Sequence, residues 1–323
     1  MCHSSSGAAL AVAAFLVLAA PASYAQYPTK TIRLIAPFAP GGSTDTVARI
    51  LAQRLTESLG QSVIVDNRSG AGGTLGADIV AKANPDGYTL MVGDFGPNVV
   101  AAGLYSKLPY DPLKSFTHIS MAVSFPLVLV SPAGSRLTSI KDYVDQARAR
   151  PGTLKYGSAG VGTSPHIFME LFQNKANLQV VHVPYKGGAP ALGGLLASEV
   201  ESALIAVSTA VAQLGAGKIK ALAVTSANPT PRLPGVPSLS SVVPGYDALN
   251  FHGVHGPAGL PPAVVKRIAD EVRKAVHRPD VRERFDGLAM EVAGSSPAEF
   301  DAYIRKQVVT WSGFVKAAGI RAD

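Results

Sequence analysis

A strand, a glycine-containing turn and the start of a helix follow one another twice in this chain, and this repeated unit constrains the fold more than any other feature. The first unit leads from the apolar run 32–36 through Gly41 and Gly42 into a helical pattern of apolar residues between 47 and 59. The second leads from a short strand at 154–157 through Gly160 and Gly162 into a helical pattern that opens near 165. Strands that alternate with helices form mostly parallel sheets, which bind ligands at the carboxyl ends of their strands. We therefore expect an α/β protein in which each unit supplies a candidate ligand loop.

Both turns have the groups that bind an anion. Glycine lets the backbone approach a ligand closely, and the unpaired N–H groups at a helix start, with the positive end of the helix dipole, favour negative charge. In the first turn Ser43 or Thr44 can cap the helix, and Asp45 falls in its first turn. In the second, Pro165 suits the first helical position, which makes Ser164 the expected N-cap. Each turn alone is typical of an ordinary capped helix, but two turns of one kind favour a ligand site.

Length and composition exclude several classes of protein. A chain of 323 residues can form two ordinary domains or one large one, and 47% hydrophobic with 16% charged residues excludes a disordered chain. The net charge of +7 suits attraction of small anions. Basic residues are scattered rather than gathered on one face with aromatic residues, so we expect no nucleic-acid partner.

The first 25 residues predict a signal peptide. An apolar run at 8–20 precedes Ser23-Tyr24-Ala25, a small-x-small cleavage site, so the mature chain is expected to begin at Gln26 in the periplasm. The run is shorter than the roughly 20 residues of a membrane-spanning helix. It lacks the usual Lys or Arg before it, which leaves the export route open. Cys2, the one cysteine, would leave with the signal peptide, so no disulfide and no cysteine-based metal site is expected.

The order of elements predicts two domains. A strand at 116–123 leads across Ser124-Phe125-Pro126 into another at 127–130, after which the strand–helix pattern starts afresh. A proline-rich stretch at 229–244 resembles an extended connection, and 251–254 is the expected returning strand. The predicted domains are therefore 26–124 plus 246–323, and 125–245.

Eight segments spread over the mature chain match one known family: PFAPGGSTD at 37–45, NRSGAGG at 67–73, PDGYTL at 85–90, LPYDP at 108–112, YGSAG at 156–160, HVPYKGG at 182–188, ALAVTS at 221–226 and AAGI at 317–320. In these segments the chain resembles the Bug (Bordetella uptake gene) family, the extracytoplasmic receptors of tripartite tricarboxylate transporters. The resemblance implies a periplasmic-binding-protein fold of type II, with two α/β domains around a ligand cleft. It also implies a monomer that binds a small carboxylate, either a di- or tricarboxylate or an aromatic acid, and delivers it to membrane permease subunits.

The resemblance also implies the ligand-binding residues, because members of the family hold a carboxylate on these two loops. Carried onto this chain, they are Phe38, Ala39, Gly41, Gly42, Ser43, Thr44, Asp45, Ser158, Ala159, Gly160, Gly162, Thr163, Ser164 and His166. One stretch departs from the family, since 204–207 replaces an aromatic-Asp-Gly turn with apolar residues. The missing acidic group makes an amine-bearing ligand less expected, and Ile205 suits an aromatic or aliphatic acid.

The residues do not predict an enzyme. The segment 157–160 lacks the spacing of a G-x-S-x-G nucleophile turn, and the glycines from Gly70 onward do not fit a dinucleotide loop. His252 and His255 are expected on opposite faces of a strand, and His166 is expected as a polar wall of the pocket. We therefore predict no catalytic residue, no cofactor and no metal. An orphan carboxylate sensor without a permease, or a secreted hydrolase or isomerase, are the alternatives.

Overall fold

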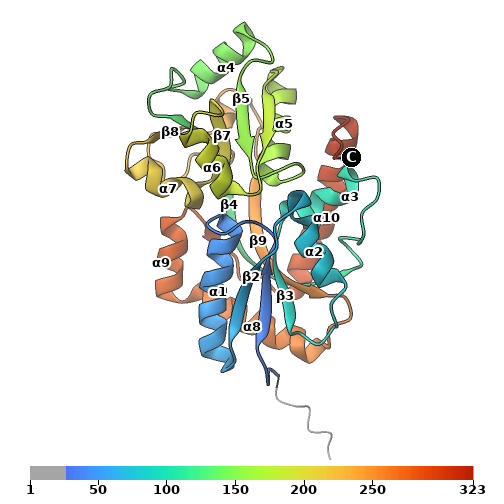
Figure 1. Ribbon diagram of the computed structural model, residues 1–323. Helices are drawn as coiled ribbons and strands as arrows, with labels where there is room; N and C mark the ends of the chain where they lie inside the picture. Colours follow the sequence, from blue (N-terminus) through green and yellow to red (C-terminus); the bar gives the residue numbers. More distant parts are fainter. Residues whose placement is uncertain (1–26, 323) are drawn as a thin grey trace, which may run out of the picture.

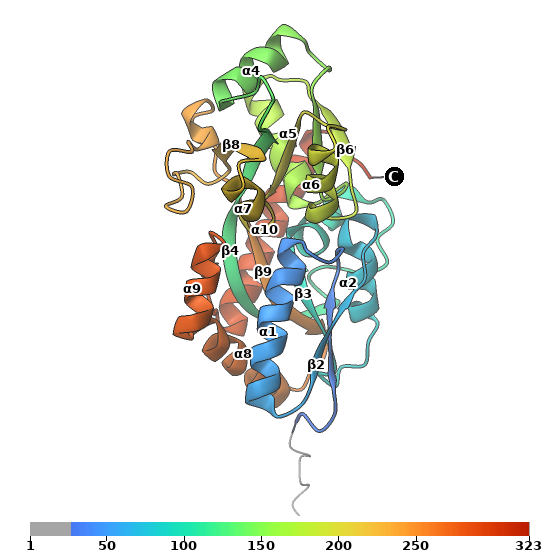
Figure 2. The same ribbon diagram turned by 60° about the vertical axis from the view of Figure 1, so that its left-hand side comes forward.

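The computed structural model describes residues 27–322, so the predicted signal peptide and the cleavage site before Gln26 lie outside the described residues. The described chain forms two lobes joined by two long strands, β4 (Phe116–Pro132) and β9 (Leu249–Pro257), which run through the middle of the molecule (Figures 1 and 2). Within residues 27–322, no helix has the length and apolar character needed to cross a membrane.

The first lobe is a twisted sheet with helices on it. The strands β1 (Ile32–Ala36), β2 (Val63–Asn67) and β3 (Thr89–Asp94) are parallel, in the order β2-β1-β3, and β9 pairs antiparallel with β3. The short β10 (Glu291–Val292) pairs with β4. The helices of this lobe are α1 (Ser43–Leu59), α2 (Thr74–Ala81), the short α3 (Ala101–Leu104) after a π-helical turn at Gly96–Val100, α8 (Pro262–His277), α9 (Pro279–Gly287) and α10 (Pro297–Ala317).

The second lobe repeats this α/β plan. The strands β5 (Lys155–Ser158), β6 (Val181–Pro184) and β7 (Ser202–Ala206) are parallel, and β7 and β8 (Ile219–Val224) pair antiparallel with the end of β4. The helices α4 (Ile140–Ala149), α5 (Ser164–Ala176), α6 (Gly188–Leu196) and α7 (Val207–Gly215) pack around it (Figure 1). The α/β fold expected from the sequence is confirmed, and each predicted loop joins a strand to a helix.

The predicted break between two strands at 124–126 is wrong, because β4 is one continuous strand. Up to Pro126 it pairs with β9, and from Leu127 onward it pairs with β7 and β8. The side chains of Leu127 to Val130 are buried on both faces, with Leu127 and Leu129 in the large core and Val128 and Val130 in the core of the second lobe. A strand buried on both faces is apolar without alternation, which the sequence shows here.

Apolar contacts also join the lobes away from the sheet. Phe95 of the first lobe packs edge-on against Phe168 of α5, with ring centroids 5.0 Å apart. Trp311 of α10 packs against both rings, at 5.0 Å from Phe95 and 5.3 Å from Phe168. Aromatic pairs in such tilted or edge-on arrangements contribute beyond their burial, so this cluster holds α10 against both lobes.

We expect Trp311→Ala to lower the free energy of unfolding by about 3 to 5 kcal/mol, because it leaves a cavity between two aromatic rings. Val309→Ala on the same helix is the matched control, since Val309 is 75% exposed and should change stability by less than about 0.5 kcal/mol. Denaturant unfolding followed by circular dichroism measures both. Equal effects for the two variants would show that the aromatic cluster does not stabilise the fold.

Candidate functional site

Four helices begin at one small cavity between the lobes, which we call the interlobe cavity. Its volume is about 30 Å³, so the lobes lie close together here. In Figure 2 the end of α1 that faces the second lobe is its start. The lining residues are Phe38, Gly42, Ser43, Thr44, Asp94, Leu127, Ala159, Thr163, Ser164, Pro165, Gly188, Ile205, Ala206, Thr209 and Asn250.

None of these four helix starts is capped by its own side chain. The N-cap residues of α1, α5, α6 and α7 are Gly42, Thr163, Gly187 and Ala206, and none makes a side-chain hydrogen bond to its helix. The first N–H groups of a helix have no partner within the helix, and its start carries about half a positive charge. None of the lining residues is Lys or Arg. Partial positive charge at this cavity therefore comes from backbone groups, which can bind a small anion, and the carboxylate of Asp94 also lines the cavity.

The predicted caps lie after the observed ones, by one residue at Ser43 and Ser164 and by two at Thr44. We expected Ser43 or Thr44, and Ser164, but the N-caps are Gly42 and Thr163, and Pro165 is the second helical residue. The Thr163 hydroxyl donates to the carbonyl of Gly160 instead of capping α5, at 2.7 Å.

Asp45 stabilises the first loop and does not line the interlobe cavity. Its carboxylate accepts hydrogen bonds from the N–H of Gly41 (3.0 Å), from Nε of Arg49 (2.9 Å) and from Nδ2 of Asn67 (3.0 Å). Burial acts to raise the pKa of Asp45, but the hydrogen bonds from Arg49, Gly41 and Asn67 outweigh it and lower the pKa. Asp45 is therefore ionised, and it fixes the backbone turn from which α1 begins.

The second loop is fixed by a stack of rings. The imidazoles of His166 and His182 are stacked with centroids 4.1 Å apart, and His166 Nδ1 accepts a hydrogen bond from the N–H of Gly162 at 3.1 Å. Ser158 Oγ lies 2.6 Å from His182 Nε2 and accepts from the N–H of Gly160 at 3.0 Å. Burial lowers the pKa of His166 to about 4, so this side chain is neutral near pH 7.

The structure divides the residues predicted for the site into two groups. The first group lines the interlobe cavity: Phe38, Gly42, Ser43, Thr44, Ala159, Thr163 and Ser164. The second group lies behind it and shapes the loops: Ala39, Gly41, Asp45, Ser158, Gly160, Gly162 and His166. Ala39 also joins the lobes, because its N–H points to the carbonyl of Lys186 at 3.4 Å.

Several lining residues were not predicted from the sequence. Asp94 ends β3, Asn250 lies in β9, and Gly188 and Thr209 belong to the first turns of α6 and α7. The rule that ligands bind at the carboxyl ends of strands could have found Asp94. The same rule could have found Thr209, which follows the end of β7, but nothing local to Asn250 could have done so, because pairing of β9 with β4 brings it to the cavity.

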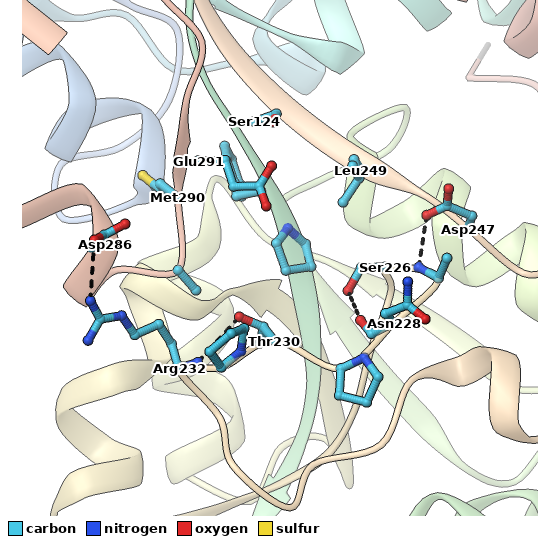
Figure 3. Close-up of a pocket in the computed structure, with 16 residues that line it drawn as sticks. Ser124, Ser226, Asn228, Thr230, Arg232, Asp247, Leu249, Asp286, Met290 and Glu291 are labelled. Atoms are coloured by element: carbon cyan, nitrogen blue, oxygen red, sulfur yellow. Dashed lines mark hydrogen bonds and ion pairs between the residues drawn. The ribbon is translucent and has the colours of Figure 1, made fainter. Parts of the chain in front are cut away.

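A larger groove of about 550 Å³ lies beside the strands that join the lobes (Figure 3). We call it the hinge groove, and its lining is Ser124, Phe125, Pro126, 226–232, Asp247, Leu249, Asp286 and 289–291. Arg232 and Asp286 form an ion pair across it at 3.5 Å, and both are well exposed. None of the four helix starts lines this groove. It therefore lacks the backbone donors that make the interlobe cavity suitable for an anion.

Metal ligands do not gather within residues 27–322, where no group of three or more His, Cys, Asp and Glu side chains is placed to hold an ion. His252 and His255 of β9 have different partners. His252 Nε2 lies 3.0 Å from Ser43 Oγ, whereas His255 Nδ1 lies 2.8 Å from His118 Nδ1. Each imidazole thus belongs to a separate contact within the first lobe.

Comparison with known proteins identifies relatives of this chain. The family model described as "Tripartite tricarboxylate transporter family receptor" matches residues 47–320. Protein BugT of Bordetella pertussis is 33% identical over 94% of this chain and 94% of its own length. The structure of R. palustris Rpa4515 with adipate has a TM-score of 0.88 and 33% identity, covering 92% of this chain and 100% of that one. MatC from Rhodopseudomonas palustris with bound malate has a TM-score of 0.85 and 30% identity, covering 90% and 100%.

We expect Asp45→Asn to destabilise the protein by about 2 kcal/mol near pH 7, because a charged hydrogen-bond acceptor for Arg49 is lost. The pKa of Asp45 is lowered by folding, so its contribution is complete above the ordinary pKa and is lost as the pH falls through the lowered one. The difference between the variant and the unaltered protein should therefore shrink in acid.

Unfolding in urea at about pH 7 and about pH 3 measures this difference. Asp145→Asn is the control, because the exposed pair of Asp145 with Lys141 should contribute less than about 1 kcal/mol. A loss for Asp45→Asn that is the same at both pH values would show that its charge does not stabilise the loop.

Proposed function

The chain belongs to the tripartite tricarboxylate transporter receptor family, to which the Bug proteins belong, and we propose that it captures a small carboxylate in the interlobe cavity. The single observation that carries this proposal is the convergence of four uncapped helix starts on that cavity. Hydrogen bonds to a charged group contribute roughly 1.5 to 3 kcal/mol each. Four or five of them would supply the roughly 8 kcal/mol of micromolar binding, less the costs of association.

The ligand class is a small di- or tricarboxylate or an aromatic acid. The structures of relatives with adipate and with malate support a carboxylate. The apolar part of the lining, which includes Phe38, Leu127 and Ile205, suits the carbon skeleton of such an acid. We assign the residues of the two predicted loops to ligand binding. Those that line the cavity contact the ligand, and those behind the cavity hold the loops in place.

Binding requires the lobes to move, because the interlobe cavity is smaller than any dicarboxylate. We assign 26–124 plus 246–323 to one domain and 125–245 to the other, joined by β4 and β9. The change in the partners of β4 between Pro126 and Leu127 supports this division. The solute enters when the lobes separate, and hinge closure brings the loop of Ala39 onto that of Lys186.

The same proposal places the mature chain in the periplasm, after removal of residues 1–25 as a signal peptide. It acts as a monomer that delivers its ligand to membrane permease subunits, as the family implies. An orphan sensor without a permease would bind the ligand in the same way, so the two roles differ only in the downstream partner.

A hydrolase would need an accessible nucleophile. The contact between Ser158 and His182 has the geometry of a serine and a base, at 2.6 Å. Ser158 is completely buried, however, and does not line the interlobe cavity. The family is one of solute-binding receptors, and the site residues of this chain fit binding without chemistry.

The proposal is tested by thermal unfolding of the mature chain with dicarboxylates, tricarboxylates, aromatic acids and neutral controls, followed by calorimetry. A ligand at a hundred times its dissociation constant should add about 2.7 kcal/mol of stability, a shift of several degrees. The bound acid should be recovered chemically unchanged. No shift with any acid, or conversion of the acid to a product, would refute a carboxylate receptor.

We expect Gly42→Val to lower affinity for the acid by roughly tenfold to a hundredfold, because its methyl groups would stand where the helix starts meet. The fold should tolerate the change, since φ of Gly42 is −81° and a Cβ there would lie 3.7 Å from the nearest atom, in ordinary contact. Gly134→Val is the control, because a Cβ at Gly134 meets nothing within 4 Å. Titration calorimetry on both variants measures the change, and unaltered affinity in Gly42→Val would place the ligand elsewhere.

A further inference from the structure

We propose that the ligand of the interlobe cavity is an amino acid, whose ammonium group is bound by Asp94 and Asn250 while its carboxylate lies at the four helix starts. This inference rests on the proposed carboxylate receptor. It replaces the di- or tricarboxylate and the aromatic acid named there with an amino acid, whose ammonium is the second polar group. It runs against the expectation from residues 204–207, where the missing acidic group made an amine less expected. Asp94 supplies an acidic group from a different strand, at the end of β3.

The Asp94 carboxylate lines the cavity without a cation beside it. It is 5% exposed, and its Oδ1 accepts a hydrogen bond from the N–H of Gly96 at 2.9 Å. Its Oδ2 is contacted by Nδ2 of Asn250, at a long 3.4 Å. Among residues 27–322, the basic group beside the Asp94 carboxylate is the His252 imidazole, whose Nδ1 lies 3.9 Å from Oδ2 of Asp94. Burial lowers the pKa of His252 to about 3, so this imidazole is neutral.

Asn250 provides a second acceptor at the same place. Its side chain is 2% exposed, its Nδ2 is directed to Asp94, and its Oδ1 has no hydrogen-bond partner although it is buried. Asn250 also lines the interlobe cavity. Buried polar groups in folded proteins almost always have partners, so an unpartnered buried oxygen at a cavity wall points to a donor supplied by a ligand.

The two acceptors together select the kind of donor. An ammonium group carries three N–H donors, so it can donate to Asp94 and to Asn250 at the same time. A hydroxyl has one donor and can satisfy only one of them. A second carboxylate would bring a like charge to Asp94, which is unfavourable in a buried site. Burial raises the pKa of Asp94 to about 6, and an adjacent ammonium would stabilise its ionised form.

The rest of the lining fits the remainder of an amino acid. The helix starts supply donors for its carboxylate, and the cavity brings them into one small space with Asp94. Phe38, Leu127 and Ile205 complete the wall with apolar groups. A side chain without charge suits these surroundings, so we assign the ligand to the apolar amino acids.

The test compares acids that share one carbon skeleton. Leucine, 2-hydroxy-4-methylpentanoate and 4-methylpentanoate are titrated by calorimetry near pH 7, with adipate as the dicarboxylate. Leucine should bind at least about tenfold more tightly than either of the other two, which corresponds to about 1.4 kcal/mol. Equal affinity for leucine and 4-methylpentanoate, or tighter binding of adipate, would overturn the amino-acid inference while leaving the carboxylate receptor in place. Failure of all four acids, together with the wider panel above, would count against the receptor itself.

Variants then test whether Asp94 and Asn250 bind the ammonium group. Asp94→Asn keeps the shape of the side chain and removes its charge, and it should reduce the preference for leucine over 4-methylpentanoate to within about threefold, which is less than 1 kcal/mol. Asn250→Leu removes the second acceptor and should reduce the same ratio, which gives an independent reading if the first variant does not fold. Asp247→Asn in the hinge groove is the control and should leave the ratio unaltered. A ratio unaffected by both cavity variants would remove Asp94 and Asn250 from ammonium recognition.

Discussion

The site depends on four helix starts and on the backbone N–H groups that they present. At the starts of α1, α5, α6 and α7 the N-cap side chains make no hydrogen bond to their helices, and all four starts meet at one cavity. A fixed arrangement of backbone dipoles binds an anion without the desolvation cost of burying Lys or Arg. The sheet makes the arrangement possible, because parallel strands end at the same edge and deliver each helix start to the crevice between the lobes.

In the proposed function, the lobes move about β4 and β9, so that these helix starts separate and return. Each helix start belongs to one lobe, α1 to the first and α5, α6 and α7 to the second, so the site is complete only when the lobes are close. Contacts at the crevice include the one between the N–H of Ala39 and the carbonyl of Lys186, whereas the opposite side is continuous sheet. The aromatic cluster of Phe95, Phe168 and Trp311 adds apolar contact between the lobes.

How much the sequence predicts depends on how local each feature is. The turns at Gly41 and Gly160 were predicted, because glycine, hydroxyl residues and the apolar pattern of the following helix lie within a few positions. The cap positions were wrong by one or two residues, and Ser43 contacts His252 of β9 while Thr163 donates to Gly160. The continuity of β4 was missed because its pairing with β9 joins residues far apart in sequence. Asn250 entered the site only through that pairing.

The carboxylates of Asp45 and Asp94 show how surroundings assign different roles to one kind of side chain. Both are buried near the helix starts, and burial acts to raise the pKa of each, but only the pKa of Asp94 is raised overall. Asp45 gains the guanidinium of Arg49 and the amide of Asn67, which lower its pKa, so its charge is already neutralised within the protein and it serves the loop. Asp94 has one backbone donor and a long contact with Asn250, and its pKa is raised to about 6. A positive group on the ligand would do for Asp94 what Arg49 does for Asp45, and only Asp94 faces the cavity where such a group can bind.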